Sequence, residues 1–112
     1  MSLTLVKPFT PKPPSNTVSI TPTTSSNNVA LSLQAVLSVA PNGSLRIVNN
    51  SGGLAYIKQG ADNTVVAAAT DIPILSGEIE VIGLRPETTY IAAVLATGTA
   101  TGAIYFSTGE GI

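Results

Sequence analysis

From Thr17 onward, apolar and polar residues alternate with a period of two along most of the chain, which is typical of β-strands. In residues 44–49, for example, Leu45 and Ile47 are expected to point inward and Arg46 outward. The same spacing predicts strands over residues 17–21, 29–40, 54–59, 78–83 and 103–108.

Turn residues separate these segments at intervals of about ten residues. Clear cases are Pro41-Asn42-Gly43, the Asn49–Gly53 cluster and Gly60–Asn63. Eight or nine short strands at such spacing predict an all-β fold, a β-sandwich of the jelly-roll or immunoglobulin-like type. The absence of Trp and of a Cys pair removes the antibody signature and favours the jelly roll slightly.

Three further segments carry specific expectations. Residues 64–69 are interpreted as a strand rather than a helical turn, because Thr and Val favour sheet. Pro73 lies inside an apolar run and indicates an edge strand or a crossing between sheets. Residues 89–96 are apolar on both faces, so they are expected to form a central strand that is covered on both sides.

Residues 78–83 show the cleanest alternation in the chain. We expect Ile79 and Val81 to be buried and Glu78 and Glu80 to lie in solvent. The two carboxylates then share one face, about 7 Å apart, a spacing that can suit a glycosidase pair. A solvated strand face is the favoured interpretation, because no aromatic residue or His adjoins them in sequence.

Residues 1–16 are predicted to form an extended, proline-rich arm, and residues 17–112 the β-sandwich domain. Four prolines between Lys7 and Asn16 exclude a helix or a central strand. The arm carries apolar side chains, and these are expected to lie on a neighbouring surface. A disordered tail is the alternative.

Composition limits the chemistry of the chain. The 112 residues include no His, Cys or Trp, and only 5 basic and 6 acidic residues. The chain offers little for acid–base catalysis, thiol chemistry or soft-metal binding, so we expect no enzyme, no metal and no cofactor. A net charge of −1 predicts no binding to nucleic acid or to an anionic membrane.

Other candidate sites are weak. Asp62, Asn63 and Asp71 match no calcium-loop spacing. Each of the three tyrosines lies within an apolar run, so core packing is preferred over stacking on sugar rings; they are Tyr56, Tyr90 and Tyr105.

Residues 71–112 resemble a group of small virion proteins of tailed bacteriophages. The shared features are Asp71–Ile74, Gly77-Glu78, the apolar run Tyr90–Val94, Gly98-Thr99 and the terminal Thr108–Gly111. The opening LTLVKPFTP is similar to the start of the cement or staple proteins of epsilon-fifteen-like short-tailed phages. The resemblance implies a jelly-roll-like fold, symmetric pairing of subunits and binding to a major capsid protein on the outside of the shell.

The leading hypothesis is therefore a capsid decoration protein that is made in the host cytoplasm and located on the virion surface. The residues expected to contact the shell or a second subunit are Leu5, Val6, Lys7, Phe9, Lys12, Arg46 and Arg85. A homodimer or another symmetric oligomer is expected. The alternatives are a module that binds carbohydrate or a host surface, and a head–tail connector or tail component.

Overall fold

The structure is a computed structural model that describes residues 10–11, 16–31 and 43–110. Within these ranges the chain forms nine strands and no helix. The strands are β1 (Thr10–Pro11), β2 (Val18–Ile20), β3 (Asn27–Ala30), β4 (Ser44–Asn49), β5 (Ala55–Gly60), β6 (Ile72–Ile74), β7 (Ile79–Gly83), β8 (Tyr90–Leu95) and β9 (Ile104–Glu110). The predicted all-β class is confirmed.

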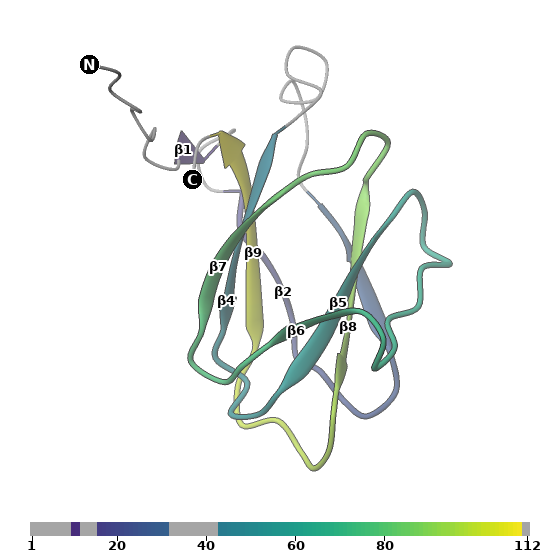
Figure 1. Ribbon diagram of the computed structural model, residues 1–112, viewed down its shortest axis with the longest axis vertical. Helices are drawn as coiled ribbons and strands as arrows, with labels where there is room; N and C mark the ends of the chain where they lie inside the picture. Colours follow the sequence, from purple (N-terminus) through teal and green to yellow (C-terminus); the bar gives the residue numbers. More distant parts are fainter. Residues whose placement is uncertain (1–9, 12–15, 32–42, 111–112) are drawn as a thin grey trace, which may run out of the picture.

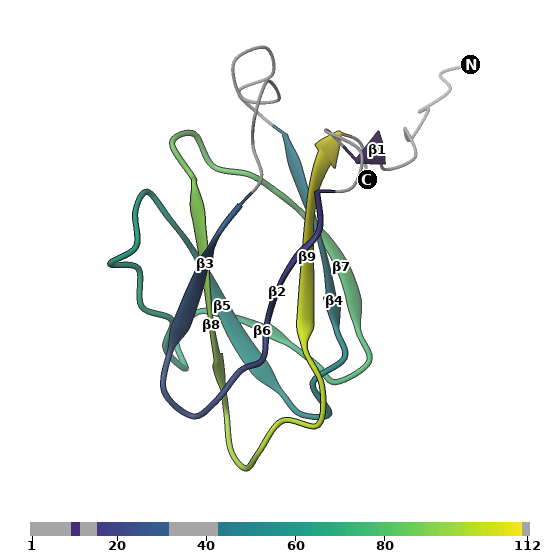
Figure 2. The same cartoon turned by 180° about the vertical axis from the view of Figure 1, so that it is seen from behind.

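The strands form two antiparallel sheets that face each other, as Figures 1 and 2 show from opposite sides. Sheet A has the order β1-β9-β4-β7, and β2 also pairs with β9. Sheet B has the order β3-β8-β5-β6. The predicted β-sandwich is therefore the architecture of the chain.

Strand pairing identifies the sandwich as a jelly roll. The chain resembles one long hairpin whose halves pair in nested order: β2 with β9, β3 with β8, β4 with β7, and β5 with β6. Rolling this hairpin adds the pairs β4–β9 and β5–β8, which is the double-sheet arrangement of eight-stranded jelly rolls. The immunoglobulin alternative does not apply, because it places its first two strands side by side in one sheet.

The core lies between the inner faces of the two sheets. Phe106, Leu45 and Ile47 from sheet A meet Ile57 and Ile91 from sheet B, and all five are almost completely buried. Burial of each such side chain contributes about 1.5–3 kcal/mol. The predicted inward orientation of Leu45 and Ile47 is confirmed.

Two predictions of strand position are also confirmed. β8 lies between β3 and β5, and both Ala92 and Ala93 on its opposite faces are fully buried. Pro73 lies on β6, an edge strand of sheet B, opposite Tyr56 of β5. β5 and β6 exchange hydrogen bonds at the residue pairs on either side of Pro73. Pro73 itself has no N–H, and its backbone nitrogen faces the free edge of the sheet.

The prediction of a strand at residues 64–69 is wrong. This segment is part of the loop between β5 and β6, and side chains from the neighbourhood of β3 hold its backbone. The Ala67 amide donates to Ser26 Oγ over 2.9 Å, and Asn28 Nδ2 donates to the Asn63 carbonyl over 2.9 Å. Side chains thus bond part of the loop backbone without a neighbouring strand, and Ala67 is buried.

The predicted orientation of residues 78–83 is wrong as well. The register of β7 places Glu80 opposite Ile47 and Ile79 opposite Val48. Since Ile47 points into the core, Glu80 and Ile82 lie on the inner face, and Ile79 is 55% exposed on the outer face. The inner position is tolerable for a carboxylate because β7 is the last strand of sheet A, where Glu80 stays half-exposed at the rim of the sandwich.

The strand predicted over residues 29–40 is described only at its start. β3 runs from Asn27 to Ala30, and Leu31 follows as a buried core residue. Residues 32–40 lie outside the described part of the chain.

Candidate interaction surface

Three acidic side chains in the described segments, Asp62, Asp71 and Glu78, hold turns. Glu78 Oε1 accepts from the Leu75 amide over 2.9 Å, and Asp71 Oδ2 accepts from the Ala68 amide over 2.8 Å. Asp62 accepts hydrogen bonds from the side chain and the backbone N–H of Thr64, and these bonds lower the pKa of Asp62. Among the described residues, no group of three or more His, Cys, Asp or Glu is arranged to hold a metal ion.

The outer face of sheet A carries an open set of apolar side chains. In one row across the sheet, Val48 of β4 lies between Tyr105 of β9 and Ile79 of β7. In the next row, Arg46 lies between Ser107 of β9 and Val81 of β7. We call Arg46, Val48, Ile79, Val81 and Tyr105 the outer strip.

Exposure makes the outer strip accessible. Tyr105 is 40% and Ile79 55% exposed, and the other three residues are half-buried. The strip ends toward β2 at a polar pair, in which the hydroxyl groups of Thr17 and Ser107 are hydrogen-bonded over 2.7 Å. The surface therefore combines an apolar centre with one cation and a hydroxyl rim, a composition found in protein interfaces.

Sequence reasoning missed most of this surface. The prediction that the tyrosines pack in the core is wrong: Tyr105 lies on the outer face of sheet A, and Tyr56 and Tyr90 are half-buried on the outer side of sheet B. A signal was present in residues 103–108, because Ile104 and Phe106 share one face and so place Tyr105 on the other.

The described part of the N-terminal stretch joins the domain at sheet A. Thr10 and Pro11 of β1 pair with Glu110 and Gly109 at the end of β9. Asn16 is buried, and its Nδ2 donates to the backbone carbonyl and the hydroxyl of Thr108. The stretch is thus attached to the strand that carries Tyr105.

Of the seven residues predicted to make contacts, the structure describes two, Arg46 and Arg85, and these two lie apart. Arg46 lies in the outer strip, whereas exposed Arg85 belongs to the turn between β7 and β8 and borders a hollow beside Lys58 and Pro73 of sheet B. The other five, Leu5, Val6, Lys7, Phe9 and Lys12, lie outside the described residues.

The Arg85 turn is held by one side chain that sequence reasoning did not single out. Gln59 Oε1 accepts from the Arg85 amide over 2.8 Å and from the Thr88 hydroxyl over 3.0 Å, and its Nε2 donates to the Gly83 carbonyl over 3.0 Å. Glu87 in this turn has a positive φ of 70°, a conformation that normally favours glycine.

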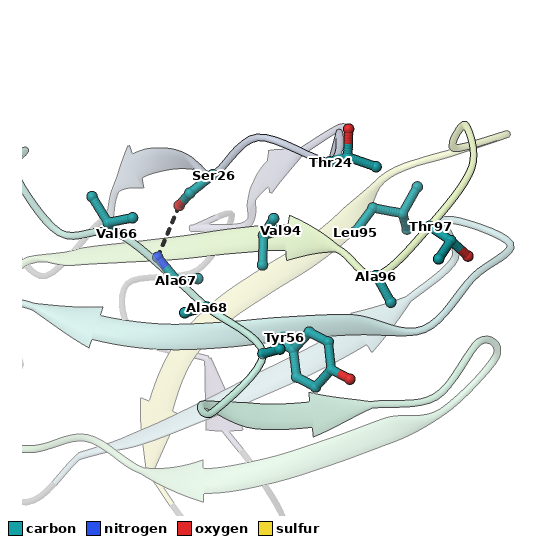
Figure 3. Close-up of a pocket in the computed structure, with 11 residues that line it drawn as sticks. Thr24, Ser26, Tyr56, Val66, Ala67, Ala68, Val94, Leu95, Ala96 and Thr97 are labelled. Atoms are coloured by element: carbon teal, nitrogen blue, oxygen red, sulfur yellow. Dashed lines mark hydrogen bonds between the residues drawn. The ribbon is translucent and has the colours of Figure 1, made fainter.

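A second surface feature lies over sheet B. The loop between β5 and β6 passes across the sheet and borders a shallow groove of about 580 Å³. Figure 3 shows Tyr56 beside this groove, with Ser26 and Thr24 on one side and the Ala67 and Ala68 backbone crossing above the strands. An aromatic ring and hydroxyl groups that line the same groove can suit a polar organic ligand.

Comparison of the chain with protein-family models, with curated proteins and with solved structures finds no match. Within the described ranges, no helix has the length and apolar character needed to cross a membrane.

Proposed function

We propose that this chain is a structural virion protein, a capsid decoration protein that binds the outside of an icosahedral phage shell and stabilises contacts between major capsid proteins. The observation that carries the proposal is the outer strip, an accessible apolar surface with one cation, on the same sheet that anchors the N-terminal stretch. The resemblance of the sequence to phage cement and staple proteins suggests that the partner is a major capsid protein.

The two parts of this surface have complementary roles. The outer strip offers a preformed patch on rigid strands, which costs little ordering entropy on binding. Residues 1–9 precede β1 and include Leu5, Val6 and Phe9, apolar anchors that suit a neighbouring protein. Each contact is small, but the outer strip and residues 1–9 belong to one chain, so the second contact forms at a high effective concentration and raises the total affinity.

Low charge on the described loops fits a close protein partner. The loops at the end of the sandwich formed by residues 21–26, 50–54 and 96–103 consist mainly of Thr, Ser, Gly, Ala and Asn and contain no Lys, Arg, Asp or Glu. The turn between β6 and β7 lies at the same end and adds one carboxylate, Glu78, so burying this end desolvates few charges and the cost that opposes many interfaces is low.

A cosedimentation experiment with empty shells of the phage that encodes the chain tests the proposal. Tyr105→Asp puts a charge at the β9 end of the outer strip, and deletion of residues 1–9 removes the anchors while keeping β1 and Asn16. Either change should lower occupancy about tenfold or more. Val66→Asp is the matched control, because Val66 is 62% exposed and lies in the loop over sheet B; it should bind as the wild type does.

Several results would contradict the proposal. Shells that fail to bind the wild-type chain would contradict the decoration role. Equal binding of the Tyr105→Asp and Val66→Asp proteins would show that the outer strip does not contribute to binding. A copy number of about a dozen per virion would favour a connector, since closed rings contain few subunits.

Carbohydrate binding is the second candidate, and the groove beside Tyr56 favours it. A glycan array probed with the wild-type chain and with Tyr56→Ala tests it directly. Binding that disappears in a folded Tyr56→Ala protein would support this function over the first, and no binding by the wild type would remove it.

A further inference from the structure

Among the described strands at the edges of the two sheets, β7 is the longest. Among the other edges, β1 and β2 span only two and three residues, β6 carries Pro73, and β3 lies beside the β5–β6 loop, to which Asn28 donates. β7 has five residues, three of them β-branched, and no proline or lysine; its one charged side chain, Glu80, points toward the inner face. Such an edge is a ready template for another strand.

The hydrogen-bonding groups that face this edge can be identified from the register. Asn49 donates to the Glu78 carbonyl and Leu84 donates to the Gly43 carbonyl, so the even-numbered residues of β7 point toward β4. The N–H and C=O groups of Ile79, Val81 and Gly83 therefore point away from sheet A. The Gly83 carbonyl accepts from Gln59 Nε2 and keeps one lone pair.

We infer that β7 pairs antiparallel with β7 of a second copy of this chain, in a register centred on Val81. Ile79 then lies opposite Gly83 of the second copy, and the two Val81 residues lie opposite each other and exchange hydrogen bonds. The fit is also steric: Ile79 is large and exposed, and the position where Gly83 would carry a Cβ has no atom within 4 Å.

Charge disfavours the neighbouring register on one side and favours the pairing of two identical copies. A register centred on Glu80 would place the two Glu80 side chains directly opposite each other, whereas the proposed register places Glu80 opposite Ile82. The ends of β7 carry opposite charges, with Glu78 before the strand and exposed Arg85 after it. Antiparallel pairing brings Arg85 of each copy to Glu78 of the other, so the same attractive contact forms twice.

The pairing extends sheet A across two copies and places both outer strips on one continuous face. This dimer does not depend on the proposed shell binding, and it is tested without shells. A monomeric variant that still binds shells would separate the two ideas.

Sedimentation of the full chain from about 1 µM to about 1 mM measures self-association. Val81→Lys sets two cations opposite each other at the centre of the pair and should weaken the dimer about tenfold or more. Val48→Lys is the matched control: Val48 lies on the same outer face but one strand in from the edge, so the dimer should persist. Arg85→Glu should weaken association several-fold, and adding Glu78→Lys should restore it.

Hydrogen exchange of the wild-type chain gives a test that needs no substitution. The amides of Ile79 and Val81 should exchange more slowly as concentration rises, while the amides of Glu80 and Ile82, bonded to β4, should be slow throughout. Three results would each overturn the inference: a monomer at every concentration, unchanged exchange at Ile79 and Val81, or a dimer lost in Val48→Lys and kept in folded Val81→Lys.

Discussion

Replacement of Asn49 by alanine should destabilise the domain strongly, because this fully buried side chain links three segments. Its Nδ2 donates to the Ile74 carbonyl over 2.8 Å and to the Gly53 carbonyl over 3.0 Å. Its Oδ1 accepts from the Ser51 amide over 3.0 Å and from the Ser51 hydroxyl over 2.6 Å. Asn49 thus joins the turn after β4 to the end of β6.

The magnitude follows from these contacts. A buried hydrogen bond contributes about 1 kcal/mol net, and a partner left unsatisfied in the interior costs about 1–3 kcal/mol. Asn49→Ala removes four such bonds, so we expect a loss of about 3–4 kcal/mol in the free energy of unfolding. Domains of this size are stable by only about 5–15 kcal/mol, so the loss is a large share of the total.

Urea unfolding followed by circular dichroism measures this loss. With a slope of about 1–3 kcal/mol per molar urea, the midpoint should fall by at least about 1 M. Ser51→Ala is the control: it removes the hydroxyl bonds to Asn49 and Gly53 but keeps the Ser51 amide bond, so its cost should be about 1–2 kcal/mol. An Asn49→Ala protein within about 0.5 kcal/mol of the wild type would refute the reasoning.

Three further predictions concern turns. Glu87→Gly should raise the free energy of unfolding by about 0.5–1 kcal/mol in urea, because a left-handed conformation costs a non-glycine residue about 1–2 kcal/mol, partly offset by the entropy of glycine; destabilisation would contradict this. Gln59→Leu should lower thermal stability by about 1–2 kcal/mol and speed exchange of the Arg85 amide; unchanged exchange at that amide would show that the turn is held by other contacts. In an NMR titration Asp62 should show a pKa below the ordinary value, and Thr64→Val should raise it by removing the hydroxyl donor. Because the folded-state pKa of Asp62 is lowered, its small contribution to stability is present above the unfolded pKa and is lost as pH falls through the folded pKa; an unchanged pKa in Thr64→Val would contradict the assignment.

Much of the fold was predictable from local pattern. The period of two and the spacing of turns identified most strands, and a proline within an apolar run identified β6 as an edge. An apolar run without alternation identified β8 as central. These features are local, because a proline ring or a two-sided apolar strand has the same consequence in any sheet.

The candidate surface was less accessible to sequence reasoning. The outward position of Arg46 followed from its two buried neighbours, but Ile79 was assigned to the core and Tyr105 was expected to be buried. The error at Ile79 has a simple cause: alternation shows that two faces differ and does not say which one meets the other sheet. The hydrophobic character of Ile79 suggested that it points into the core, but the register of β7 against β4 places it on the outer face.

The sequence by itself determined the period, the turns and the scarcity of charged groups, since each depends on neighbouring residues or on composition. Tertiary structure alone decided the jelly-roll pairing, the loop at residues 64–69 and the face on which Glu80 lies. These features depend on contacts between distant segments, such as β2 with β9, in which Val18 lies opposite Phe106. Such pairs are chosen by the best burial of the whole chain, and a short stretch of sequence does not contain that information.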